Sequence, residues 1–186
     1  SVILDEMGNL RDPGSQLEAS ALIDKMKESK EGVTIAPSPR VPMRVIEDTV
    51  RLLQNEGIQN LRVLGFVARD GRLFASIGES WVMRSRAADI ESSAYTASAA
   101  ELALDRKLLA DIAKSSGLVD NLPPGQKPLL YQIFVNEVGE IVGIQQRRGP
   151  KIPALENELM RARVVSPGRR GADAVPVVVN VEVPVP

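Results

Sequence analysis

The sequence predicts an α+β protein with two small two-layer α/β sandwiches, joined by a helical and linker segment. In the N-terminal part, short apolar strands alternate with single amphipathic helices, which is typical of a sheet with its helices on one face. In the C-terminal part, two strands and a helix precede a strand rich in valine. Between the two parts, the stretch Gly117–Gly125 holds two prolines and continues no periodic pattern, so we expect the domain break there.

The first predicted domain, residues 1–70, has the order β-α-β-α-β. Its three strands are expected at Val2–Leu4, Val33–Ala36 and Leu61–Val67. Ser15 and Glu18 have the spacing of a capping box and predict the start of the first helix. Pro42 suits the first turn of the second helix, and Gly57 suits the position just after its end. Each helix has one apolar face, made of Ala19, Leu22, Ile23 and Met26 in the first and of Met43, Ile46, Val50 and Leu53 in the second.

Residues 71–124 are expected to form a helical connector and a linker. Asp70 and Gly71 predict a turn at its start. A helix is predicted over Ala97–Ser115, where an apolar stripe recurs at helical spacing: Leu102, Leu104, Leu108, Leu109, Ile112 and Ala113. Such a stripe belongs to a core more often than to a functional site, so we assign no site to it.

The last predicted domain, residues 125–186, begins with a β-hairpin. Its first strand is indicated by Tyr131, Ile133 and Val135, which alternate with Gln132, Phe134 and Asn136. Gly139 can adopt the positive φ of a tight turn, and Ile141–Gln146 is the return strand. A helix follows, with Pro153 in its first turn. Its apolar face is expected to be Ile152, Leu155, Leu159 and Ala162.

The clearest pattern in the chain is its last run, in which valine occupies every odd position from Val175 to Val185. This is the pattern of a half-buried strand with one apolar face. Pro176 and Pro184 have no N–H to donate to a ladder, so the strand is expected at a sheet edge. We expect the odd face to pack on the last helix and the free edge to recruit another strand. The candidate partner-binding residues are Val178, Val179, Asn180, Val181 and Glu182.

The order β-β-α-β, followed by Ser166, Pro167, Gly171 and the valine-rich strand, resembles the C-terminal domain of TonB-type energy transducers. Arg163 and Val165 stand where that family prefers aromatic residues. The resemblance implies a domain that engages a protein partner rather than an enzyme. The residues also leave open another kind of small α+β domain that ends in a β-strand.

The first domain has an opening strand with a turn at Gly8 and then the segment Gly32–Gly65. In this order the two features resemble the periplasmic domain of the ExbD/TolR family. Six residues fit the family pattern: Val33, Ile35, Ala36, Gly57, Ile58 and Val63. Pro37 and Pro42 replace its usual Asp and Tyr. Both resemblances belong to one proton-driven transport system, so each strengthens the other.

Composition excludes several kinds of chemistry. The chain has no cysteine and no histidine, which excludes disulfides, thiol catalysis, Ser-His-Asp triads and histidine metal ligands. Adjacent acidic residues such as Glu47 and Asp48 are expected to be solvated surface, and no phosphate-loop motif occurs. A net charge of -1 counts against a general nucleic-acid binder. We therefore expect no enzyme, no cofactor, no metal site and no nucleic-acid partner.

From these resemblances we expect a periplasmic, non-enzymatic module of a cell-envelope energy transducer driven by an ion-motive force. It would be the periplasmic part of an inner-membrane-anchored protein whose membrane helix precedes Ser1. The resemblances imply a homodimer, an ExbB/TolQ-like inner-membrane motor subunit, and peptidoglycan or an outer-membrane protein as the outer partner.

Two basic clusters are candidate contacts for an anionic partner, although a solvated face is the simpler interpretation. The first contains Arg147, Arg148 and Lys151, before the last helix, and the second contains Arg161, Arg163, Arg169 and Arg170, after it; the chosen contacts are Arg147, Arg148, Lys151, Arg169 and Arg170. Two other functions stay open. One is a cytoplasmic adaptor or RNA-binding module built from small α/β domains. The other is an enzyme that uses carboxylates from distant segments.

Overall fold

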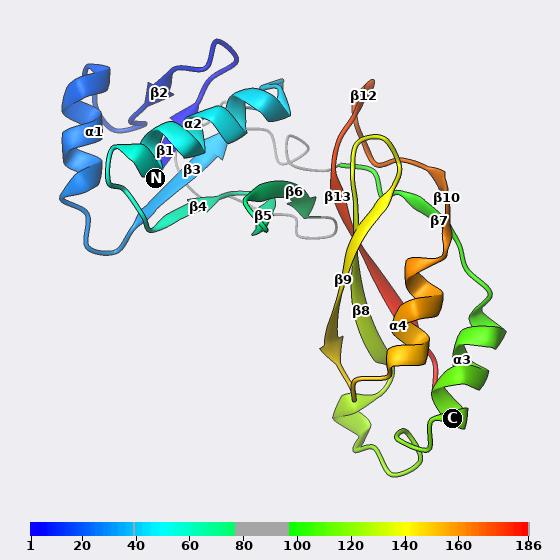
Figure 1. The fold of residues 1–186 in the computed structure, drawn as a ribbon. Coiled ribbons are helices and arrows are strands. Elements are labelled where there is room, and N and C mark those ends of the chain that lie inside the picture. The colour runs from blue at the N-terminus through cyan, green and yellow to red at the C-terminus, as the bar shows by residue number, and fades with distance from the viewer. Residues whose placement is uncertain (39, 77–96, 186) are drawn as a thin grey trace. The chain divides into compact units, whose positions relative to one another are not determined.

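The computed structural model describes residues 1–38, 40–76 and 97–185 (Figure 1). They fold as two compact units. The first unit contains Ser1–Leu73, and the second contains residues 74–76 and the chain from Ala97 onward. In each unit helices cover a β-sheet, which confirms the predicted α+β class of small domains.

The first unit is built on a four-stranded sheet with the order β2-β1-β3-β4. Its strands are β1 (Val2–Leu4), β2 (Leu10–Arg11), β3 (Val33–Pro37) and β4 (Leu61–Val63), and its helices are α1 (Ala19–Lys27) and α2 (Met43–Asn55). β3 runs parallel to β1 and to β4, and β2 is antiparallel to β1. Alternate strand residues join both helices in one apolar core, which includes Val2, Leu4, Leu22, Met26, Val33, Ile35, Ile46, Leu53 and Val63. Both helices therefore pack on the same face of the sheet.

Two local predictions for this unit are wrong. The side chain of Ser15 donates a hydrogen bond to Asp12 rather than capping α1, which begins at Ala19 without a side-chain cap. The predicted strand Leu61–Val67 is two strands, β4 and β5 (Phe66–Arg69). The amide of Leu64 donates to Ile35, and Gly65 then turns the chain with a φ of 74°. The hairpin from β5 to β6 (Arg72–Ser76) turns at Asp70 and Gly71, as predicted.

The end of α2 is stabilised by backbone hydrogen bonds around Gly57. The amide of Gly57 donates to Gln54 and that of Ile58 donates to Leu53, which is the pattern of a Schellman motif. Gly57 has a φ of 91°, and a Cβ there would meet nothing within 4 Å. We therefore expect Gly57→Ala to destabilise the first unit by about 1 kcal/mol through backbone strain alone. Urea unfolding of the variant and the parent protein measures this difference. An unchanged midpoint would contradict it.

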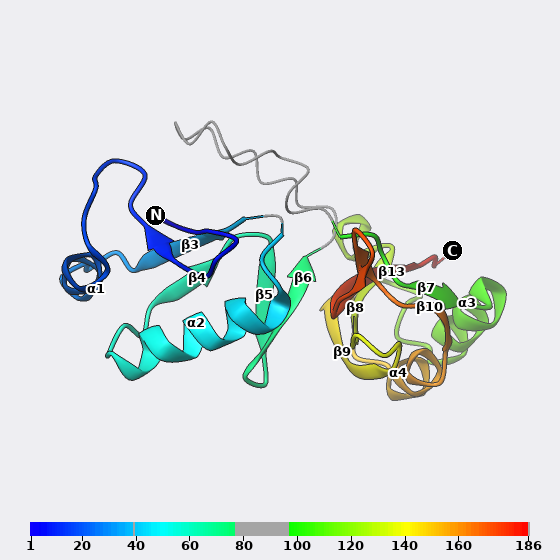
Figure 2. The same ribbon diagram turned by 90° about the horizontal axis from the view of Figure 1, so that it is seen from above.

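The second unit is organised around three long antiparallel strands in the order β13-β8-β9. They are β8 (Leu129–Val135), β9 (Ile141–Arg148) and β13 (Val177–Val183). The end of β6 pairs in parallel with β13, through Ala75 opposite Val177 and Ser76 opposite Val178. Helices α3 (Arg106–Ser115) and α4 (Pro153–Met160) lie next to each other on one side of this sheet (Figure 2).

The buried face of this sheet comes from alternate residues of β8 and β13. It joins Leu109 and Ala113 of α3 and Leu155 and Leu159 of α4, as the apolar spacing predicts, whereas Leu108 of the predicted stripe is exposed. The buried strand residues are Leu129, Tyr131, Ile133, Val135, Val177, Val181 and Val183. Smaller elements complete the unit: β7 (Glu101–Ala103) pairs with β10 (Arg163–Ser166), β11 (Arg169–Arg170) pairs with β12 (Asp173–Ala174), and η2 (Pro124–Gln126) is a short 3-10 helix.

The segment predicted as a connector has a different organisation. The predicted helix over Ala97–Ser115 is wrong for its first half, where β7 pairs with β10, and α3 begins after Asp105. The Asp105 carboxylate accepts a hydrogen bond from the amide of Leu108 and caps the helix. Residues 97–124 belong to the second unit, because α3 packs against α4 and β13. The predicted break at Gly117–Gly125 therefore lies inside that unit, and residues 77–96 of the predicted connector lie outside the described residues.

Candidate functional site

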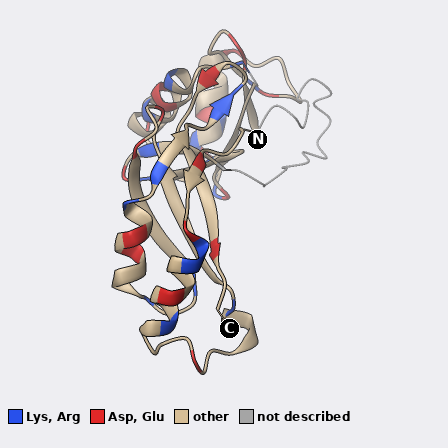
Figure 3. Ribbon diagram, turned by 90° about the vertical axis from the view of Figure 1, so that its right-hand side faces the viewer, with Lys and Arg blue, Asp and Glu red and all other residues tan. Residues whose placement is uncertain are grey.

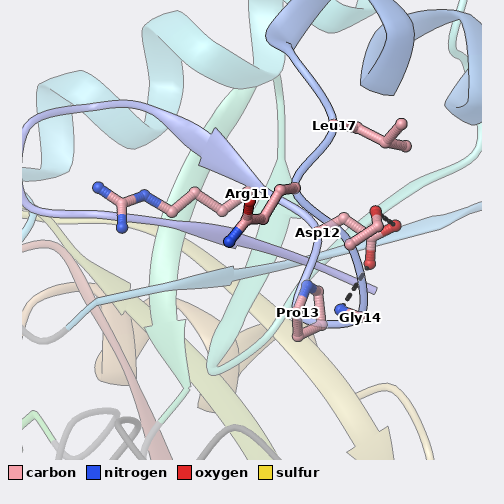
Figure 4. Close-up of a pocket in the computed structure, with 7 residues that line it drawn as sticks. Arg11, Asp12, Pro13, Gly14 and Leu17 are labelled. Atoms are coloured by element: carbon pink, nitrogen blue, oxygen red, sulfur yellow. Dashed lines mark hydrogen bonds between the residues drawn. The ribbon is translucent and has the colours of Figure 1, made fainter.

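A hollow of about 670 Å³ in the first unit is lined by seven consecutive residues, 11–17, of one loop (Figure 4). The Asp12 carboxylate organises that loop. It accepts hydrogen bonds from the amide of Gly14 at 3.1 Å, the hydroxyl of Ser15 at 2.9 Å and the ammonium of Lys25 at 2.6 Å. These contacts, the one with Lys25 first, lower the pKa of Asp12 to about 2. Asp12 is the only acidic residue that lines the hollow, and its carboxylate already accepts these three hydrogen bonds from the protein itself. We therefore interpret the loop as structural.

Asp12 gives the first unit a defined pH dependence. Its pKa is lower in the folded chain than its ordinary value of 3.8, so its contribution to stability is present above pH 4 and is lost as the pH falls toward 2. Asp12→Asn is therefore expected to lower the melting temperature at neutral pH and to make little difference near pH 2. Thermal unfolding of both proteins across this pH range tests the expectation. An equal difference at both ends would contradict it.

The described residues offer little for acid–base or metal chemistry. Among them, no group of three or more acidic side chains lies close enough to hold a metal ion. Burial raises the pKa of Tyr131 to about 12, and the nearby Glu156 carboxylate adds to the rise, so this phenol stays protonated at neutral pH. No helix in the described ranges is long and apolar enough to cross a membrane.

The structure separates the predicted basic clusters into structural and exposed residues. Arg148 donates to the carbonyl of Pro128 at 2.7 Å and pairs with Glu182 at 3.2 Å. Arg169 donates a hydrogen bond to the carbonyl of Ala172. Arg170 is half-buried and interacts with another group of the protein. Arg147, Lys151 and Arg169 are exposed, so an anionic partner would meet these three first.

Basic and acidic residues alternate along much of the ribbon of both units (Figure 3). An interspersed arrangement of this kind does not build a large single-sign field. The charge pattern alone therefore does not point to a site.

The predicted partner-binding strand is β13, and its side chains divide between two faces. Val181 is buried on the face that packs on the helices, as expected. Val179, which was expected in the core, is half-buried, whereas Asn180 and Glu182 are exposed on the opposite face. Val178 is buried on that opposite face in a small cluster with Phe74 and Phe134.

This cluster is the part of the site that the sequence did not indicate. Phe74 and Phe134 meet edge to face, with ring centroids 5.2 Å apart. Phe74 lies on β6, about one hundred residues before its neighbour Val178. The sequence signal for this cluster was Phe134, the one off-pattern apolar residue in the alternation Tyr131–Asn136, which marks where the outer face of the sheet is covered.

The backbone of β13 has one fully paired side and one partly paired side. Each residue of β13 lies opposite a residue of β8, from Val177 opposite Val135 to Val183 opposite Leu129. On the other side, the carbonyl of Pro176 accepts a hydrogen bond from the amide of Ala75 at 2.9 Å. Pairing with β6 ends at Ser76, opposite Val178. Past that point, no strand among the described residues covers this side of β13.

The direction of each backbone group follows from the Pro176 bond. Successive residues of a strand point their N–H and C=O groups to opposite sides. Even-numbered residues therefore face the β6 side, and odd-numbered residues face β8. Asn180 and Glu182 consequently direct their backbone N–H and C=O groups toward the β6 side. Their side chains are exposed on the face of the sheet opposite the helices. We call the stretch Val179–Val183 on this side the β13 edge.

No protein-family model, no curated protein and no solved structure matches the chain.

Proposed function

We propose that the chain is a non-enzymatic module that transmits motion within a cell envelope, as part of an energy transducer driven by an ion-motive force. The observation that carries this proposal is the β13 edge together with the order β8-β9-α4-β13, in which the short strands β10, β11 and β12 stand between α4 and β13. The order is the one that the TonB-type resemblance leads us to expect. A first unit with two helices on one face of its sheet accompanies it, in agreement with the ExbD/TolR-like resemblance.

The geometry of β13 suits the transmission of a force. A strand added to the β13 edge would bond to the backbone of Asn180 and Glu182. A pull along that strand passes into β13, which is held to β8 through seven opposed residue pairs. In such a shearing geometry the ladder bonds share the load rather than opening one at a time. The apolar face of β13 is fixed by α3 as well.

In this proposal the protein is the periplasmic part of an inner-membrane-anchored protein. An ExbB/TolQ-like motor subunit drives it, and peptidoglycan or an outer-membrane protein receives the motion. Arg147 and Lys151 are exposed cations that precede α4 in the chain, and they are available to an anionic outer partner.

Photo-cross-linking in living cells tests the proposal. A photoreactive amino acid would replace Asn180 on the β13 edge in the full-length gene product, and a control would carry it at Asn157, an exposed residue of α4. We expect adducts in the envelope fraction from position 180, with a pattern that changes when a protonophore collapses the ion gradient. Position 157 should not respond. A protein that fractionates with the cytosol, or adducts at 180 that ignore the protonophore, would overturn the proposal.

A further inference from the structure

A small cavity in the first unit lies between helix α2 and the hairpin of β5 and β6. Its volume is about 110 Å³. One wall comes from α2, through residues at positions i, i+3, i+4 and i+7, which share one face of a helix. The other wall comes from the hairpin and its turn. The lining residues are Glu47, Val50, Arg51, Gln54, Ala68, Gly71, Arg72 and Leu73.

The packing of the hairpin against the helix forms this cavity without a ligand. Asp70 and Gly71 have φ values of 48° and 75°, which suit a tight hairpin turn. Leu73 is buried in the apolar core of the unit, and Val50 packs against the same core. The amide of Leu73 donates a hydrogen bond to the Glu47 carboxylate at 3.4 Å. An apolar surface and an oriented carboxylate are therefore in place before anything binds.

The cavity is lined by charges of both signs. Within the described ranges, the Leu73 amide is the one hydrogen-bond or ion-pair partner of the half-buried Glu47 carboxylate. Arg51 pairs instead with Asp48 at 3.3 Å, and both of those side chains are more than half exposed. Such exposed pairs are weak, so the Arg51 guanidinium can turn to a ligand at little cost. Arg72 brings a second guanidinium to the opposite wall.

We propose that this cavity binds a small free α-amino acid of the size of glycine or alanine. Its ammonium lies beside Glu47 and its carboxylate lies beside Arg51. Side chains four residues apart on a helix are neighbours, and one carbon atom separates the two charged groups of an α-amino acid, so the spacings agree. A ligand with only a negative charge would be repelled by the Glu47 carboxylate, and one with only a positive charge would be repelled by the guanidinium groups.

The size of the cavity limits the side chain of the ligand. A cavity of about 150 Å³ accommodates benzene, so the smaller volume here suits glycine or alanine better than a larger amino acid. The methyl group of alanine would contact the apolar side chains of Val50, Ala68 and Leu73. The whole site belongs to the first unit, so it depends neither on the β13 edge nor on the proposed function.

An NMR titration of the isotope-labelled protein at neutral pH tests the site without any substitution. Alanine would be compared with propionate, which lacks the ammonium, and with ethylammonium, which lacks the carboxylate. We expect alanine to shift the amide signals of Gly71 and Leu73 in a saturable way. Each of the other two ligands should bind at least about tenfold more weakly, because it loses one charged hydrogen-bonded contact.

Three substitutions on α2 then assign the charges. Glu47→Gln keeps an acceptor for the Leu73 amide and should weaken alanine binding by at least about tenfold, but it should not weaken propionate binding. Arg51→Gln should weaken the binding of both. Arg44→Gln is the control, because Arg44 is exposed on the same helix and does not line the cavity. Saturable shifts that are absent at about 20 mM alanine, propionate that binds as tightly as alanine, or equal effects of Arg44→Gln and Arg51→Gln would overturn the proposal.

Discussion

Replacing Gly168 with alanine is expected to destabilise the second unit by about 2–3 kcal/mol. A Cβ at this position would lie 2.9 Å from the Cβ of Val177 and would overlap both of its methyl groups. Val177 is completely buried and is fixed between Val135 and Ala75 in the sheet, so it cannot move aside. Chemical denaturation followed by circular dichroism would show the loss as a lower midpoint.

A matched control distinguishes this steric effect from a general cost of removing glycine. Gly125 lies in η2, has ordinary backbone geometry and would place a Cβ in open space. Gly125→Ala should therefore stay within about 0.5 kcal/mol of the parent protein. In the Gly168→Ala background, Val177→Ala should cost less than it does alone, because it removes the methyl groups that the new Cβ would overlap. Equal effects of Gly168→Ala and Gly125→Ala would contradict the explanation.

The sequence predicted the elements that have a long, regular pattern. The valine alternation of β13, the hairpin turn at Gly139 and the apolar face of α4 all lie where periodicity indicates. These signals are local, because each strand or helix has to present one apolar face to the core. The prediction that β13 lies at the edge of its sheet is wrong, because β6 pairs with its first residues on one side and β8 pairs with all of it on the other.

Short or long-range features could not be predicted in the same way. The capping-box spacing at Ser15 and Glu18 is common by chance, and here Asp12 competes for the Ser15 hydroxyl. The apolar stripe that starts near Leu102 suits a helix, but the pairing of β7 with β10 decides the conformation of its first residues. The pairing of β6 with β13 joins segments that are far apart in the chain, and no local pattern reports which strands meet. For this reason the sequence placed Val178 on the free edge, whereas the structure covers it with Phe74.

The second large effect concerns two adjacent positions in β13 that should respond to proline in opposite ways. The amide of Val181 faces β8, where it lies opposite Tyr131. Val181→Pro removes that ladder bond, leaves a buried carbonyl without its donor and replaces a core valine with a ring of different shape. We expect a loss of about 3 kcal/mol or more, enough to unfold the second unit. Loss of the native circular dichroism signal at room temperature would report it.

The amide of Asn180 faces the β13 edge instead, because the carbonyl of Pro176 on the same side bonds to Ala75. Asn180→Pro should therefore keep the ladder to β8 and most of the stability, while it removes one edge donor from each copy. In the homodimer that the family resemblances imply, two lost hydrogen bonds should weaken self-association by about tenfold, which sedimentation velocity can measure. Asn180→Ala keeps the backbone amide and is the control. Its self-association should be much closer in strength to that of the parent protein. If Asn180→Pro unfolds the unit as Val181→Pro does, the assignment of backbone direction along β13 is wrong. If it folds and associates undiminished, the edge is not where the two chains meet.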